Sequence, residues 1–432
     1  MALKGKISDY QEFVAELNAN LDEWLKTPRG EWEAFAVKSV NGLASEEVRR
    51  LVSLDNRRQN GIFFTDSKLA NRVLRGLQPV FTKQSKIYDP ACGAGNLLIS
   101  VADYLRSESQ MLMNEGSFMG TDIHKPFLEA ARLRFLINEL LFSPDCKSDF
   151  MLKKDARFVV KQCDGLFHNE FYQKATHIFT NPPFNLVQTK EKLDWSQGQV
   201  SAAALFMDKI VQYVNTGTSI YAILPDVLRS GTRYEKWRRH ITKQCVVERI
   251  ELLGQFDKYA DVDVFSIHLT KKSRQFKVGK STFEKAKINT DAKVVEDTFN
   301  VCVGPVVDNR DEKIGPVRNF VVSKGLEGWT TQTRFNLLRS HSGKSFKSPF
   351  IVIKRTSRMG DAQRAIATII NSKRNVYVDN HLIVLQPKSG TLNDCKKMLE
   401  NLKKIETDNW INNKIRCRHL TVKVVAKIPI WP

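Results

Sequence analysis

The chain has 432 residues, 42% hydrophobic and 26% charged, so it can bury one large core and a second, smaller one. No apolar run approaches the roughly 18 residues of a membrane-spanning helix, and no apolar stretch follows the first basic residues as in a signal peptide. The seven cysteines form no CxxC pair, which argues against a disulfide framework and a zinc site. We therefore expect a cytoplasmic protein without a bound metal.

The net charge of +20 is concentrated in the last third of the chain. Residues 271–432 contain 32 Lys and Arg against 14 Asp and Glu, a net of +18. Such a segment favours a polyanionic partner, because each phosphate that Lys or Arg neutralises releases condensed counterions. The alternative is a solvated basic surface that serves only solubility.

The first 55 residues show a helical pattern. Apolar residues such as Phe13, Leu17 and Leu21 recur at helical spacing, and the pattern is interrupted by the turn TPRG at 27–30. This predicts a helical lead-in over residues 1–55.

A different rhythm, of short β-rich runs separated by helical segments, occupies residues 86–272. Alternation of strand and helix predicts an α/β fold with a parallel sheet that is covered on both faces. The last two runs are close together, as in an antiparallel hairpin at the sheet edge. The seven runs are 86–91, 117–123, 158–164, 177–184, 219–226, 246–253 and 264–272, and helical periodicity is clear at 96–106, 127–141 and 202–214.

The pattern changes again after about residue 274, where the chain becomes irregular and basic. Short strands are expected at 350–355 and 375–387, and a helix near 391–405. We therefore expect an α+β domain at the C-terminal end, with the boundary in Lys271–Lys285. The predicted domains are 1–55, 56–274 and 275–432.

The first strand of the sheet runs into the loop DPACGAGN, residues 89–96. The glycine pair Gly93 and Gly95 at a strand-to-helix turn lets the backbone pass close to a ligand at the carboxyl edge of the sheet. A phosphate-binding loop fits less well, because the third glycine of a dinucleotide fingerprint and the GK[ST] of a P-loop are missing. The loop could also be only a tight turn.

Acidic residues close the next two strands. Asp122 ends the second in GTDI, and Asp164 ends the third in QCDG. A carboxylate at this place can accept hydrogen bonds from both hydroxyls of a ribose. Each acid alone is more typical of a turn or a helix cap, but their recurrence on one edge favours an adenosine-containing ligand.

The fourth strand ends in Thr180-Asn181-Pro182-Pro183-Phe184. Two prolines make this turn rigid and remove two backbone donors. The side-chain carbonyl of Asn181 and the main-chain carbonyl of Pro182 could both accept from an exocyclic amine, and Phe184 offers a face for base stacking. An amine held in this way exposes its lone pair to an electrophilic methyl group. The alternative is a proline turn beside a core phenylalanine.

In this order, GIFFTD (61–66), DPACGAGNLL (89–98), GTDI (120–123), QCDGL (162–166) and TNPPF (180–184) resemble the motifs of gamma-class adenine-N6 DNA methyltransferases, the N-6 DNA methylases of restriction-modification systems. The resemblance covers about residues 55–275 and implies a class I methyltransferase with a Rossmann-like seven-stranded sheet. It implies that Thr65 touches the methionine part of S-adenosylmethionine, Asp122 holds the ribose and Asp164 the adenine amine. It implies a catalytic site of Asn181, Pro182, Pro183 and Phe184, and a cofactor site of Phe64, Thr65, Asp89, Ala91, Gly93, Gly95, Asn96, Asp122, Ile123, Asp164, Gly165 and Asn181.

The resemblance also implies the partners. The basic C-terminal domain stands where this class carries its target-recognition domain, so double-stranded DNA is the expected substrate, in a bacterial or phage-encoded protein bound to the nucleoid. Any cognate restriction endonuclease would be a separate protein. The match is poorer at Asp263-Val264-Phe265, which leaves the second base-stacking residue unassigned. The alternatives are an RNA methyltransferase acting on adenine N6 or guanine N2, a protein glutamine methyltransferase, and a non-catalytic DNA-binding module.

Overall fold

The protein is described here from a computed structural model. Its contacts divide the chain into two compact units, residues 1–229 with 233–285, and residues 230–232 with 286–432. No helix among the described residues is long and apolar enough to cross a membrane. The described residues are 5–26, 32–109, 116–142, 158–189, 193–196, 198–256, 262–273, 283, 293–357, 361, 363–415 and 419–431.

A seven-stranded sheet forms the centre of the first unit, in the order β3-β2-β1-β4-β7-β9-β8. Neighbouring strands are parallel except at β9, which is antiparallel to both β7 and β8. The predicted α/β fold is confirmed, and each predicted run forms one strand. The hairpin of the last two runs is present, but β9 lies inside the sheet and only β8 is at the edge. The strands are β1 (Ile87–Asp89), β2 (Phe118–Asp122), β3 (Phe158–Gln162), β4 (His177–Thr180), β7 (Ser219–Pro225), β8 (Cys245–Gln255) and β9 (Asp263–Lys271).

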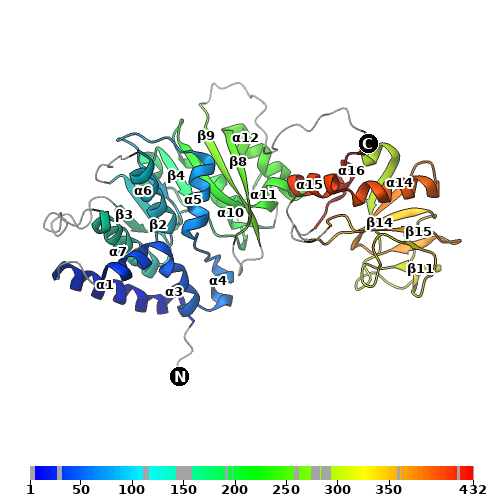
Figure 1. Ribbon diagram of the computed structural model, residues 1–432, viewed down its shortest axis with the longest axis horizontal. Coiled ribbons are helices and arrows are strands. Elements are labelled where there is room, and N and C mark those ends of the chain that lie inside the picture. Colours follow the sequence, from blue (N-terminus) through cyan, green and yellow to red (C-terminus); the bar gives the residue numbers. More distant parts are fainter. Residues whose placement is uncertain are drawn as a thin grey trace. The chain divides into compact units, whose positions relative to one another are not determined.

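Helices cover both faces of this sheet (Figure 1). Because side chains alternate along a strand, Ile87 contributes to the hydrophobic cluster on one face and Tyr88 to the cluster on the other. This explains why the strands have continuous apolar runs. The first face is covered by α5 (Ser67–Leu77), α6 (Asn96–Ser109) and α7 (Lys125–Phe142), and the second by α9 (Glu170–Lys174), α10 (Ala202–Tyr213) and α12 (Glu235–Gln244).

The N-terminal helices belong to the same hydrophobic core as the first face of the sheet. Tyr10 is fully buried, donates to the carbonyl of Ala44 at 3.1 Å, and packs edge to face against Phe127 of α7. The expected lead-in is therefore helical and is packed onto the sheet-covering helix α7. Its elements are η1 (Ile7–Tyr10), α1 (Gln11–Lys26), α2 (Trp32–Lys38), the π-helical turn η2 (Ser39–Leu43), α3 (Ala44–Leu51) and α4 (Leu54–Asn60).

Four further short elements of the first unit were not expected from the sequence. Strands β5 and β6 pair antiparallel, with Leu186 opposite Ser201. They are too short, and β5 is too exposed, to leave a clear apolar pattern. These elements are β5 (Leu186–Gln188), β6 (Gln199–Ser201), α11 (Asp226–Ser230) and η4 (Thr232–Tyr234), whose first residues lie at the division between the units.

The second unit is an α+β domain, as expected. One face of its five-stranded sheet, β10-β17-β14-β15-β12, shares a hydrophobic cluster with four helices, and the other face packs against a three-stranded sheet, β13-β11-β16. The expected strand at 350–355 and the helix near 391–405 are present, but the run at 375–387 is divided by the turn at Asn380 and His381 into β16 and β17, which lie in different sheets. The elements are α13 (Val295–Thr298), β10 (Phe299–Val303), β11 (Val317–Val321), β12 (Thr331–Gln332), β13 (Leu338–Ser340), β14 (Phe350–Lys354), β15 (Ala367–Ile370), β16 (Val376–Val378), β17 (Leu382–Pro387), α14 (Leu392–Lys403), α15 (Ile405–Lys414) and α16 (Val422–Ala426).

Candidate active site

A cavity of about 240 Å³ lies at the carboxyl ends of β1 to β4. This is the edge at which open α/β sheets bind ligands. Three of the residues expected at the site, Gly95, Pro182 and Phe184, do not line the cavity. Those that line it are Phe64, Thr65, Asp89, Ala91, Gly93, Asn96, Asp122, Ile123, Asp164, Gly165, Asn181 and Pro183.

The glycine loop after β1 forms one wall. Gly93 has φ 53° and donates its backbone N–H to Oδ2 of Asp122 at 3.0 Å. A Cβ on Gly93 would lie 2.8 Å from the ring of Phe64, so a side chain there would collide with the wall opposite. Gly95, with φ 81°, faces Ala131 of α7 instead, and a Cβ there would lie 3.2 Å from the Ala131 methyl. Gly95 therefore allows the loop to pack closely against α7, on the side away from the cavity.

Two acids meet at this wall, and both have raised pKa values. Burial raises the pKa of Asp89 to about 7, and the nearby charge of Asp122 adds to the effect. Burial also raises the pKa of Asp122 to about 6, although Oδ1 accepts from the backbone N–H of His124 at 2.8 Å and Oδ2 from Gly93. Each carboxylate oxygen of Asp122 keeps a further lone pair for a ligand donor.

The third acid, Asp164, lies on the neighbouring loop after β3. Its Oδ1 accepts from the backbone N–H of Leu166 at 2.9 Å, which is a turn contact that leaves Oδ2 for other partners. The absence of a side chain at Gly165 lets this loop approach the glycine loop closely, because a Cβ on Gly165 would lie only 2.0 Å from the carbonyl oxygen of Pro90.

Asn181 lies at the end of β4 with its amide orientation fixed. Its Nδ2 donates to the carbonyl of Phe63 and to Oγ1 of Thr65, both at 3.0 Å. A carbonyl can only accept, so the NH₂ must face residues 63–65 and Oδ1 must face away. Oδ1 is buried and has no hydrogen-bond partner in the described structure. A buried acceptor without a partner carries a free-energy cost that a ligand donor would remove.

Pro182 and Phe184, both expected in the catalytic site, do not form part of the cavity wall. Pro182 is buried. The ring of Phe184 packs edge to face against Phe256, with centroids 5.4 Å apart and an interplanar angle of 82°. Phe184 contributes to the hydrophobic clusters on both sides of the sheet, which holds the ring against the core. Val264 and Phe265 are fully buried as well, so neither is available as the second stacking residue.

Sequence reasoning missed several residues of the cavity wall, among them Asn185. Its Nδ2 donates to the carbonyl of Gln59 at 2.9 Å, and its Oδ1 is buried without a partner in the described structure. Asn185 directly follows TNPPF, so a motif one residue longer would have included it. The other wall residues that were not singled out are Gln59, Asn60, Gly61, Ile62, Phe63, Pro90, Cys92, Leu97, His124, Phe127, Leu166, Val187, Ala202 and Phe206.

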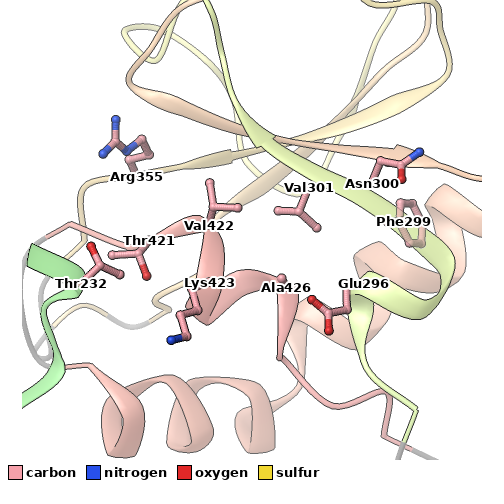
Figure 2. Close-up of a pocket in the computed structure, with 10 residues that line it drawn as sticks. All are labelled: Thr232, Glu296, Phe299, Asn300, Val301, Arg355, Thr421, Val422, Lys423 and Ala426. Carbon is pink, nitrogen blue, oxygen red and sulfur yellow. The ribbon is translucent and has the colours of Figure 1, made fainter. Parts of the chain in front are cut away.

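The second unit has a larger hollow of about 630 Å³, formed mainly by β10, α13 and α16 (Figure 2). Its wall includes Asn300, Arg355 and Lys423. The segments 354–357 and 419–420 adjoin one another beside Arg355. The backbone N–H of Leu420 donates to the carbonyl of Arg355 at 2.8 Å, and Thr356 forms a β-bridge with His419. Arg358 and residues 416–418 lie outside the described residues.

Solved structures with a similar fold include restriction-modification proteins. The type IIL restriction-modification enzyme MmeI, solved in complex with DNA, is 13% identical with a TM-score of 0.50, over 91% of this chain and 66% of that chain. A class I S-adenosylmethionine-dependent methyltransferase from Listeria monocytogenes is 17% identical with a TM-score of 0.36, over 63% and 91%. The M protein of the type I restriction enzyme EcoKI is 17% identical with a TM-score of 0.38, over 63% and 65%. At these identities the likeness to MmeI concerns the fold alone.

Sequence comparison gives a more specific result. The family model described as N-6 DNA Methylase matches residues 49–292, a span that includes every residue of the cavity wall. No curated protein sequence matches the chain significantly.

The raised pKa of Asp89 gives a testable effect on stability. The folded protein holds a proton on Asp89 that the unfolded chain has released, so stability is lost as pH rises from about 4 through the folded pKa of about 7. Asn at this position stays neutral and can still accept from Ala91. We therefore expect Asp89→Asn to raise the melting temperature of the ligand-free protein relative to wild type at pH 8 more than at pH 5. Thermal unfolding at both pH values measures this, with Asp22→Asn on the exposed face of α1 as control. An equal change at both pH values would contradict the assignment.

Proposed function

Because the family model matches more than half of the 432 residues, the chain belongs to the N-6 DNA methylase family, and we propose that it transfers a methyl group from S-adenosylmethionine to N6 of a flipped-out adenine in a specific duplex DNA sequence. The membership favours DNA over the RNA and protein substrates that the sequence left open. A non-catalytic module would have no need for the arrangement around Asn181.

The observation that carries this proposal is the buried, unpartnered Oδ1 of Asn181. Since Phe63 and Thr65 fix the NH₂ of the side chain, the oxygen is held ready for a donor in the cavity. The exocyclic amine of adenine is such a donor. A hydrogen bond accepted from it draws the amine towards tetrahedral geometry and exposes the nitrogen lone pair. Preorganised acceptors of this kind stabilise the transition state without reorganising during the reaction.

The acids on the same edge fit the cofactor. The oxygens of Asp122 can accept from the two ribose hydroxyls, and Asp164 can accept from the adenine amine of the cofactor through Oδ2. The glycine at 93 keeps the loop close enough to contact the ligand. When bound, S-adenosylmethionine supplies an electrophilic methyl group on its sulfonium. No general base is required, because the amine proton can leave to water after the attack.

The second unit is proposed to select the DNA sequence. Residues 271–432 carry +18 of the net charge, which supplies phosphate contacts but no sequence information. Base contacts must come from polar side chains of the same unit, and the adjoining segments at 354–357 and 419–420 bring Arg, Thr and His together. Flipping the adenine costs a few kcal/mol of unstacking, which these contacts would offset. A cognate endonuclease would be a separate cytoplasmic protein.

Replacing Asn181 tests the catalytic site. Asn181→Ala removes the acceptor for the target amine, so transfer of labelled methyl groups to unmethylated DNA should fall by a factor of at least 100, about 2.7 kcal/mol in barrier. Calorimetry should show S-adenosylmethionine affinity within about threefold of wild type. Retention of more than about a tenth of wild-type kcat would refute the assignment.

The cofactor assignment predicts a pH dependence. The pKa of Asp122 is about 6 in the ligand-free protein, and only the carboxylate accepts from both ribose hydroxyls. The affinity for S-adenosylmethionine should therefore fall as pH decreases from 7 to 5, by up to about tenfold per pH unit below 6. In Asp122→Asn the affinity at pH 7 should be lower and this part of the pH dependence should be gone, leaving only the contribution of Asp89. If affinity depended on pH identically in wild type and Asp122→Asn, Asp122 would not bind the ribose and would serve only to stabilise the turn.

The role of the second unit can be tested by removing single charges. Lys354→Ala should weaken binding to duplex DNA and reduce the slope of log affinity against log salt by about 1, if Lys354 contacts one phosphate. Lys403→Ala on α14 removes the same charge from the same unit and serves as control. Equal effects of the two substitutions would mean that only net charge matters, and that the segment at 354–357 makes no specific contact.

A further inference from the structure

We propose that Asn96 is a positioning residue, which sets the orientation of the Asn181 amide through Thr65 and is itself held by the buried guanidinium of Arg134. The inference rests on the proposed function, since it concerns how the acceptor on Asn181 is held. It gives the side chain of Asn96 a different role from that of a cofactor-binding residue, which the resemblance implied.

The side chain of Asn96 is already engaged by the protein. Its Nδ2 donates to the carbonyl of Thr65 at 2.8 Å and to Oγ of Ser45 at 3.1 Å. Its Oδ1 accepts from Nη1 of Arg134 at 2.6 Å. Both donors and one acceptor lone pair are therefore used, although Asn96 lines the cavity. A side chain with these commitments holds neighbouring groups in place, and it offers a cofactor little.

The contacts continue from Asn96 to the catalytic residue. Asn96 fixes the backbone of Thr65, and Oγ1 of Thr65 accepts from Nδ2 of Asn181 at 3.0 Å. Thr65 is only 3% exposed, so its hydroxyl cannot readily exchange this contact for water. If the Thr65 backbone moves, one of the two bonds that orient the Asn181 amide is lost. The direction of the unpartnered Oδ1 then depends on the bond to Phe63 alone.

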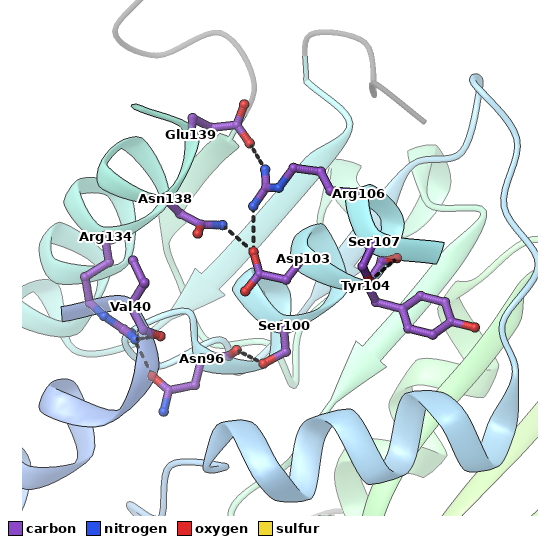
Figure 3. A network of polar contacts seen from close by, with 10 residues as sticks. All are labelled: Val40, Asn96, Ser100, Asp103, Tyr104, Arg106, Ser107, Arg134, Asn138 and Glu139. Carbon is purple, nitrogen blue, oxygen red and sulfur yellow. Dashed lines mark hydrogen bonds and ion pairs between the residues drawn. The ribbon is translucent and has the colours of Figure 1, made fainter. Parts of the chain in front are cut away.

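Arg134 holds the far end of this chain of contacts from Asn96 through Thr65 to Asn181, which we call the relay (Figure 3). It is fully buried, and burial lowers the pKa of its guanidinium to about 10. It donates to the carbonyls of Ser39 at 2.6 Å, Val40 at 3.2 Å and Ala94. Arg134 thus joins the N-terminal π-helical turn and the glycine loop to Asn96. A helix residue tied to two other segments cannot rotate away, which keeps Asn96 pointing at Thr65.

Asn138, a second buried asparagine in Figure 3, provides a matched control for the loss of an asparagine hydrogen bond. Asn138 lies one turn after Arg134 on α7, is 1% exposed, and donates to Oδ1 of Asp103 at 3.0 Å. Asp103 in turn accepts from Arg106, which also pairs with Glu139. Among the described residues, Asn138 and Asp103 form no hydrogen bond with Thr65 or Asn181, and neither residue belongs to the cavity wall. Loss of a buried asparagine hydrogen bond can therefore be compared at two nearby places.

The test compares Asn96→Ala and Asn96→Asp with Asn138→Ala. Asn96→Asp keeps an acceptor for Arg134 and so protects the fold, but it places an oxygen against the Thr65 carbonyl in place of a donor. We expect kcat for methyl transfer to fall at least tenfold in both Asn96 variants, with S-adenosylmethionine affinity within about threefold of wild type. Asn138→Ala should lower the melting temperature comparably to Asn96→Ala while kcat stays within about twofold. If Asn96→Ala does not fold, Asn96→Asp decides.

A second measurement does not depend on activity. The side-chain NH₂ of Asn181, assigned in ¹⁵N spectra by its loss in Asn181→Ala, should be protected from hydrogen exchange in wild type and in Asn138→Ala. It should lose at least tenfold of that protection in Asn96→Asp. Unchanged protection in Asn96→Asp, or a kcat no lower than that of Asn138→Ala, would overturn the proposal. A fall of cofactor affinity as large as the fall in kcat would also overturn it, since Asn96 would then bind the cofactor directly.

The outcomes separate this inference from the proposed function. If wild type transfers no methyl group to adenine, the proposed function fails, while the exchange measurement still decides whether Asn96 positions Asn181. If wild type is active and the Asn96 variants match Asn138→Ala, the proposed function stands and the relay is refuted.

Discussion

The buried guanidinium of Arg134 constrains the whole catalytic half of the molecule. A charged group with five N–H donors cannot leave water unless its donors find partners, and here the partners are carbonyl and amide oxygens from two separate parts of the chain. These are the turn at residues 39–40 and the end of the glycine loop, from Ala94 to Asn96 at the start of α6. The requirement makes the N-terminal helices a part of the site, because without them two of the carbonyls would be missing.

The edge of the sheet shows the opposite electrostatic situation. Asp89, Asp122 and Asp164 are gathered where the chain offers them mainly backbone donors, and burial raises the pKa values of the first two. Such a cluster costs stability in the ligand-free protein. Together with the unpartnered oxygens of Asn181 and Asn185, it makes the edge rich in acceptors and short of donors. A ligand with several N–H and O–H groups would supply the missing donors, which is the physical reason for proposing that the cofactor binds there.

The sequence predicted the seven strands and the loops after β1 to β4 well, because the buried strands carry continuous apolar runs and four of the five motifs stand at the ends of these strands. Contacts between distant segments were not predictable in this way. Arg134 looks like an ordinary surface charge on a helix, and nothing local reveals that Ser39 and Val40 will face it. The orientation of Phe184 depends on Phe256, which is 72 residues away. Short strands with exposed side chains, such as β5, left no pattern, and neither did the insertion of β9 between β7 and β8.

That insertion affects how the chain can be made. Strand β9 supplies the hydrogen bonds for both β7 and β8, so β8 has no neighbour in the sheet until residues 263–271 have been synthesised. A nascent chain that has emerged only as far as residue 255 would hold an apolar β7 with an open edge and a detached eleven-residue strand. Open edges of this kind pair readily with other chains. The methyltransferase half is therefore most prone to aggregation during the last steps of its own synthesis. A chain whose translation stops before β9 would have two strands with unpaired edges, and it would not form a smaller functional domain.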